Sequence, residues 1–150
     1  MQNVYGERFD LMRAGRHVLV HLPKNTHAEG TLLRIEAEAR RLGKQCADIY
    51  FQVLNVTGKW AASEQSDGLH FNAADSVTEE PRWLKLGSVE LKVVHGHTLQ
   101  GLRYLNLYLK HLAHTGFTVG GLLGEDEHTQ QSTPSSECVH HTSMFEYSPP

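Results

Sequence analysis

The dominant pattern in this chain is alternation between apolar and polar residues over short runs. Of the four runs 17–22, 49–56, 89–94 and 102–112, the second is rich in β-branched and aromatic residues and the other three show the alternation. In the first run, Val18 and Val20 would lie on one face of an extended chain, and in the last run Leu105, Leu107 and Leu109 would do so. A period of two residues is typical of half-buried β-strands, so we predict that these faces form the core.

Glycines separate these runs and a shorter apolar run at 69–71. The glycines expected to mark turns are Gly58, Gly68, Gly87, Gly96, Gly101 and Gly116. Short strands divided by glycine turns predict an all-β fold with sandwich-like antiparallel sheets and at most one or two short helices. We expect Trp60 and Trp83 to anchor the core of this fold.

The segment 31–42 fits two patterns. Apolar residues at helical spacing, a threonine before them and a glycine after them favour a helix. Alternation of Ile35, Ala37 and Ala39 with charged residues favours a half-exposed strand instead. We predict a strand because the neighbouring segments are β-rich.

Size and charge bound the class of protein. A chain of 150 residues fits one domain, and a net charge of −3 without a basic stripe gives no support for nucleic-acid binding. No apolar run is long enough to span a membrane, and no secretory signal is visible at the start, so we expect a fragment of a longer multidomain protein.

The charge is unevenly distributed. Residues 124–150 contain five acidic residues and no lysine or arginine, together with serines, threonines and prolines. We therefore divide the chain into a β-rich domain at 1–129 and an irregular, acidic tail at 130–150.

The chain has two cysteines, Cys46 and Cys138. A bridge between them would dock part of the tail on the domain and, in the chain-entropy model, stabilise the fold by about 4–5 kcal/mol. The alternative is a pair of independent thiols, and both interpretations remain open.

An acidic segment follows a glycine-rich stretch at 120–124. Glu125, Asp126 and Glu127 supply three carboxylates, which are ligands that calcium prefers, beside glycines that expose backbone carbonyls. One calcium ion is therefore the candidate cofactor. The alternative is a solvated acidic turn, since the spacing matches no EF-hand loop.

Other candidate sites are weaker. His95 and His97 would share one face of a strand and could chelate a metal, although zinc needs three or four converging ligands. Asn55 begins an Asn-Val-Thr tripeptide, the acceptor pattern for N-glycosylation. Trp60, Trp83 or Tyr108 would form a carbohydrate platform if their rings faced solvent.

Two motifs near opposite ends of the chain suggest a family. Gly-Glu-Arg-Phe-Asp at residues 6–10 is followed by Gly15 and the apolar run 17–20, and Gly-Leu-Leu-Gly-Glu-Asp occupies residues 121–126. Together they resemble the von Willebrand factor type D family of extracellular domains. That family opens with phenylalanine, aspartate, glycine and an apolar strand, and it closes its core with a Gly-Leu-Cys-Gly-Asn turn before calcium-binding acidic residues.

The resemblance implies an extracellular sandwich with calcium at Glu125, Asp126 and Glu127. The chain departs from the family where Leu123 replaces the cysteine and Glu125 replaces the asparagine, so most family disulfides are absent. The same motifs, with the stretches 46–51 and 55–60, are also similar to repeated domains of marine algae such as dinoflagellates, for which no activity is known.

These observations predict a non-catalytic, extracellular or cell-surface module for adhesion or assembly. Its partner would be a protein or a glycan. The alternatives are a metal-dependent hydrolase that uses the histidine and acidic clusters, and a carbohydrate-binding module.

Overall fold

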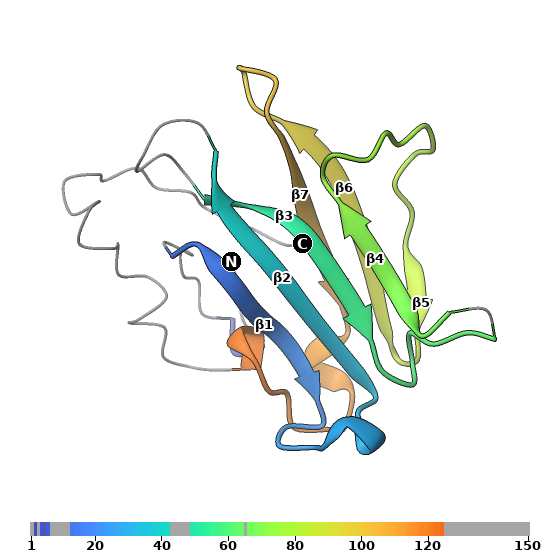
Figure 1. The fold of residues 1–150 in the computed structure, drawn as a ribbon. Coiled ribbons are helices and arrows are strands. Elements are labelled where there is room, and N and C mark those ends of the chain that lie inside the picture. The colour runs from blue at the N-terminus through green and yellow to red at the C-terminus, as the bar shows by residue number, and fades with distance from the viewer. Residues whose placement is uncertain (1, 3, 7–12, 43–48, 65, 125–150) are drawn as a thin grey trace.

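The computed structural model describes residues 2, 4–6, 13–42, 49–64 and 66–124, and all its strands belong to one antiparallel sheet (Figure 1). The strands are β1 (Gly15–Leu22), β2 (Leu33–Arg41), β3 (Ile49–Thr57), β4 (Gly68–Asn72), β5 (Leu84–Leu86), β6 (Val89–His97) and β7 (Arg103–Lys110). Single turns of 3₁₀ helix lie at η1 (Ala28–Gly30), η2 (Leu112–His114) and η3 (Leu122–Gly124). The all-β prediction is confirmed.

The sheet branches at β3. One edge of β3 pairs with β2 along its whole length, and the other edge is shared by two strands. β4 pairs with Val53–Thr57, whereas β7 pairs only where Leu105 lies opposite Phe51. The sheet therefore consists of two wings, β1–β2–β3–β4 and β7–β6–β5, joined at that pair. In Figure 1, the second wing runs behind the first.

One cluster of buried apolar side chains joins the two wings. Leu105 and Leu107 are buried and Leu109 packs partly buried against the cluster, as the alternation in β7 predicts. Opposite them, β3 contributes Phe51 and Leu54. The core therefore lies on a single face of the sheet, called here the inner face.

The segment 31–42 is a strand, which confirms the prediction. Ile35, Ala37 and Ala39 of β2 are buried, while Arg34 and Glu36 point to the other side. β2 pairs with β1 and β3 on its two edges. Because both edges of the strand gain ladder hydrogen bonds and its small alanines fit the close-packed inner face, tertiary context overrides the helical propensity of the segment.

The predicted core face of β1 is partly wrong. A β-bulge falls between Val18 and Val20, since these residues pair with the consecutive residues Glu36 and Ile35. A bulge inserts one extra residue and changes which side chains face inward. Leu19 and Val20 are fully buried, whereas Val18 is only half-buried and belongs to the opposite face.

Gly96 was expected in a turn but lies inside β6, directly opposite Tyr104 of β7. A Cβ atom at Gly96 would lie 2.6 Å from the Tyr104 ring, so the ring occupies the space that a side chain would need. Gly68 likewise begins β4 rather than a turn, and the short β5 was not predicted. The remaining expected turn glycines, Gly58, Gly87, Gly101 and Gly116, all lie outside the strands.

The two tryptophans lie in different environments. Trp60 packs partly buried against the core, with its ring over Gly87 and its centroid 6.2 Å from that of Phe117. Trp83 is not part of the core cluster, so the prediction for this residue is wrong. It immediately precedes β5, where alternation with the inward-facing Leu84 turns it toward the other side of the sheet.

Candidate functional site

The glycine-rich bend at 120–124 is fastened to β1. His21 and Gly120 exchange two backbone hydrogen bonds of 2.9 and 2.8 Å, which form an isolated antiparallel bridge. The backbone N–H of Val4 donates to the carbonyl of Leu123 at 2.8 Å. Val4 and the bend at 120–124 therefore meet beside β1.

Two of the bend glycines make approaches that no other residue allows. Gly121 has a φ of 86°, and a Cβ there would lie 2.7 Å from the carbonyl carbon of Leu19. A Cβ at Gly124 would lie 2.0 Å from the carbonyl oxygen of Val119. Both obstacles are backbone atoms, so the bend depends on glycine at these positions.

Several predicted site residues lie outside the described residues. These are the candidate calcium ligands Glu125, Asp126 and Glu127, the cysteines Cys46 and Cys138, and the tail at 130–150. The calcium site and the disulfide therefore stay predictions. The structure does place the preceding residue, Gly124, which is buried.

Asn55 lies within β3, between Glu36 of β2 and His70 of β4. Its side chain is half-buried, and its Oδ1 atom lies 2.5 Å from Nδ1 of His70. Thr57 of the acceptor tripeptide is the last residue of the strand. Glycosylation of Asn55 stays a prediction.

The histidines among the described residues are dispersed. His95 and His97 share one side of β6, as expected. His111 lies apart from them and approaches Glu90, with 3.5 Å between Nε2 and Oε2. No group of three or more His, Cys, Asp or Glu side chains among the described residues is arranged to hold a metal ion. The described part of the chain thus gives the metal-dependent hydrolase no support.

Two adjoining hollows lie between β6 and the segment 71–84, and they share Val77 and His95. The larger, of about 460 Å³, includes Asp75, Ser76 and His97 in its lining. Its lining contains residue types found in nucleophilic sites, but no hydrogen bond joins Ser76 to either histidine or to Asp75. A nucleophile requires a base within hydrogen-bonding reach. The hollow contains these residue types, but they are not arranged as a nucleophile and its base.

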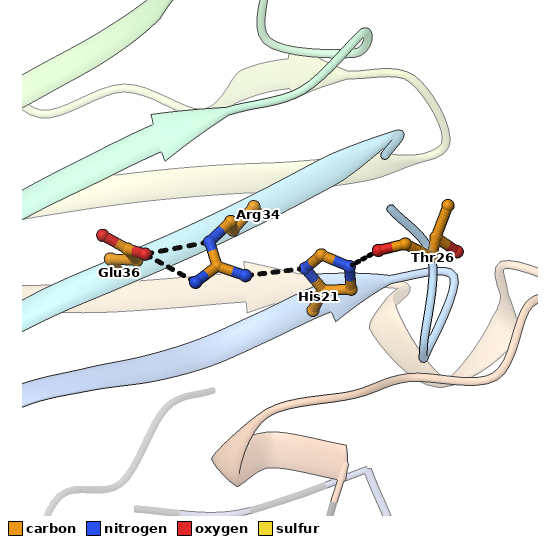
Figure 2. A network of polar contacts seen from close by, with 4 residues as sticks. All are labelled: His21, Thr26, Arg34 and Glu36. Atoms are coloured by element: carbon orange, nitrogen blue, oxygen red, sulfur yellow. Dashed lines mark hydrogen bonds and ion pairs between the residues drawn. The ribbon is translucent and has the colours of Figure 1, made fainter. Parts of the chain in front are cut away.

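A polar network closes one end of the sheet (Figure 2). Arg34 donates from Nη1 to Nδ1 of His21 at 3.0 Å, and from Nε to Oε1 of Glu36 at 2.9 Å. Because arginine has no acceptor, Nδ1 of His21 must accept, and Nε2–H donates to the carbonyl of Thr26 at 2.8 Å. The network links Glu36 and Arg34 of β2 through His21 to Thr26, and therefore fastens the loop after β1 to β2.

The side of the sheet opposite the core is open to solvent over both wings. We call it the outer face. Its residues on β2, β3, β6 and β7 include Arg34, Glu36, Glu38, Arg40, Tyr50, Val53, Asn55, Glu90, Lys92, Val94, Tyr104, Asn106, Tyr108 and Lys110, none of which is buried. An antiparallel sheet can leave one face solvated, so exposure alone is ordinary. The feature that bears on function is the group of aromatic and basic side chains on this face.

Two aromatic groupings lie on the outer face. The rings of Tyr50 of β3 and Tyr104 of β7 pack in a tilted arrangement across the junction of the wings, with centroids 4.6 Å apart and an interplanar angle of 33°. Further along, the ammonium of Lys110 lies 4.0 Å from the ring centroid of Trp83, and that of Lys92 lies 4.9 Å from Trp83 and 5.2 Å from Tyr108. We call Trp83, Lys92, Tyr108 and Lys110 the lysine–aromatic cluster.

The sequence contained part of this signal. Alternation in 102–112 places Tyr104 and Tyr108 opposite the buried leucines, and alternation in 89–94 places Lys92 opposite Leu91. What the sequence does not contain is the register that sets Lys92 directly beside Tyr108, because that pairing depends on how two separate strands align.

Comparison with protein-family models, with curated proteins and with solved structures gives no match for this chain. Its function therefore has to be argued from its own residues. Among the described residues, no helix has the length and apolarity that crossing a membrane requires.

Proposed function

We propose that this chain is a non-catalytic adhesion or assembly module of an extracellular or cell-surface protein, similar to the type D domains, and that it binds partners through the outer face. The observation that carries the proposal is the composition of that face. Tyrosine, tryptophan and arginine are the residues most enriched where proteins bind one another. Here Tyr50, Tyr104 and Tyr108 share a solvated surface with Trp83 and Arg40.

The junction of the wings makes this surface well ordered. Tyr104 lies over Gly96 and against Tyr50, so its ring is held between two strands instead of extending freely into solvent. A rigid aromatic side chain loses little conformational entropy when it binds a partner. The Tyr50–Tyr104 pair is therefore the expected centre of the contact.

Calcium at Glu125, Asp126 and Glu127 is the second part of the proposal. The acidic segment begins directly after Gly124, and the bend before it is hydrogen-bonded to β1 and to Val4. A cation bound there would act on a fixed part of the fold, because its first ligand follows a buried residue. Its role would be to stabilise the region where Val4, β1 and the bend at 120–124 meet.

The test uses beads coated with the full chain on surfaces coated with the chain itself, with collagen or with fibronectin, in millimolar calcium. We expect retention on at least one surface, lost in the double variant Tyr50→Ser/Tyr104→Ser. The matched control is Tyr5→Ser, because Tyr5 is 66% exposed and lies outside the outer face. Equal retention of the two variants, or no retention on any surface, would contradict the proposal.

A further inference from the structure

We propose that the lysine–aromatic cluster binds sulfated or carboxylated polysaccharide chains. The inference rests on the proposed binding role of the outer face and assigns a ligand class to one end of it. The cluster lies on the β5–β6–β7 wing, away from the Tyr50–Tyr104 pair: Lys92 pairs with Tyr108 in the ladder, four residues along β7 from Tyr104.

The two cluster lysines keep their charge available. Neither Lys92 nor Lys110 forms an ion pair with a described carboxylate, and each ammonium rests against an aromatic ring instead. A ring attracts an ammonium through its quadrupole but carries no net charge, so it positions the cation without neutralising it. Glu90 lies opposite Lys110 in the ladder but forms no ion pair with it, so both ammonium groups are left to attract an external anion.

The geometry brings the two charges together. Both ammonium nitrogens contact the Trp83 ring, which limits their separation to about 9 Å. Because the rings already restrict both long side chains, binding an anion costs less ordering than it would for free surface lysines. Trp83 thus acts as the support of a two-lysine site.

The local charge agrees with an anionic ligand. The wing strands β5, β6 and β7 carry Lys85, Lys92 and Lys110 on the outer face, whereas Glu90 is their one carboxylate. Glu90 also approaches His111 at 3.5 Å. This excess of positive charge lies in a chain whose formal net charge is −3, so it is a local feature of one surface.

The form of the surface favours a polysaccharide over other anions. Small ligands are usually enclosed by concave pockets, whereas this part of the sheet is an open face that suits an extended chain. A nucleic acid carries closely spaced phosphates and calls for a broad basic surface, which two lysines in an acidic protein do not provide. A sugar chain carries sparser anionic groups, and its apolar ring faces can pack on Tyr108 and on the edge of Trp83.

The experiment measures fluorescence anisotropy of a labelled heparin decasaccharide titrated with the full chain. We expect saturable binding that weakens by about tenfold in Lys92→Gln/Lys110→Gln and loses the salt dependence of about two ionic contacts. The matched control is Lys24→Gln/Lys59→Gln, which removes two exposed lysines outside the outer face and should bind like the wild type. Trp83→Leu keeps every charge yet should weaken binding, because the lysines lose their support.

Four results would overturn the inference: no binding of heparin, equal weakening in the control, unchanged binding in Trp83→Leu, or tighter binding of a single-stranded oligothymidylate than of heparin. Thermal melts verify that each variant is folded. If Trp83→Leu does not fold, the comparison of Lys92→Gln/Lys110→Gln with Lys24→Gln/Lys59→Gln decides the question. The bead experiment is independent. Heparin binding can fail while retention still depends on Tyr50 and Tyr104, in which case only the ligand class is wrong.

Discussion

Replacing Gly121 with alanine should destabilise the protein strongly, because this glycine lies where the bend touches β1. Its φ of 86° is in the left-handed region, which costs an L-residue about 1–2 kcal/mol. The new Cβ would also lie 2.7 Å from the carbonyl carbon of Leu19 and 2.8 Å from the carbonyl oxygens of Leu19 and Val18. These atoms belong to a paired strand and cannot rotate away.

The expected loss follows from these two contributions. Overpacking a well-packed site costs about 1–3 kcal/mol, so the left-handed backbone and the contact with β1 together give a loss of about 3 kcal/mol. For a domain of this size, 1 kcal/mol lowers Tm by about 2–4 °C, so we expect a decrease of about 6–12 °C. Because total stabilities are about 5–15 kcal/mol, the variant should still fold.

Gly116→Ala is the matched control. Gly116 has a φ of 83°, close to that of Gly121, but a Cβ there meets no atom within 4 Å. The control therefore carries the backbone penalty without the steric one. Urea denaturation of both variants, followed by circular dichroism, gives the difference directly. If Gly121→Ala costs no more than Gly116→Ala, the bend does not pack against β1 as described.

Three further predictions concern the core and the residues beyond the described part. Leu19→Ala should lower the free energy of unfolding by about 2–5 kcal/mol in urea denaturation and Val18→Ala by much less, because the bulge buries Leu19; equal losses would argue against the bulge. Calcium at about 100 times its Kd should add about 2.7 kcal/mol of stability, raising Tm reversibly in the wild type but not in Asp126→Asn; an unchanged wild-type melt rejects the site. If Cys46 and Cys138 are bridged, reduction should raise the intact mass by two hydrogens, whereas an unchanged mass indicates free thiols.

Neither the local sequence pattern nor the composition could predict that the residues of the lysine–aromatic cluster lie together. Trp83 seemed a core residue because large aromatic side chains usually are, yet it packs with lysines on the outer face. Trp83 and Tyr108 were both candidates for a carbohydrate platform, on the condition that their rings face solvent. That the two rings share Lys92 depends on the pairing of β5 with β6 and of β6 with β7.

Local chemistry alone was enough to predict β3, β6 and β7. A half-buried strand must alternate, so the runs around Val89 and Leu105 revealed their structure without any knowledge of their partners. The inward leucines of β7 follow from the same rule. The run at Ile49 revealed its structure through its β-branched and aromatic residues. The glycines at 120–124 could likewise be identified as a close-packed bend, since a cluster of residues without side chains in a β-rich chain has few other uses.

Tertiary structure decided whatever depends on two distant segments at once. Leu19 displaces Val18 from the core because β1 bulges against β2, and three consecutive apolar residues cannot reveal which of them is the extra one. Gly96 lies in a strand because Tyr104 covers it from the neighbouring strand. The branching of the sheet at β3 has the same origin: a strand offers two edges, and only the folded chain determines which strands share one of them.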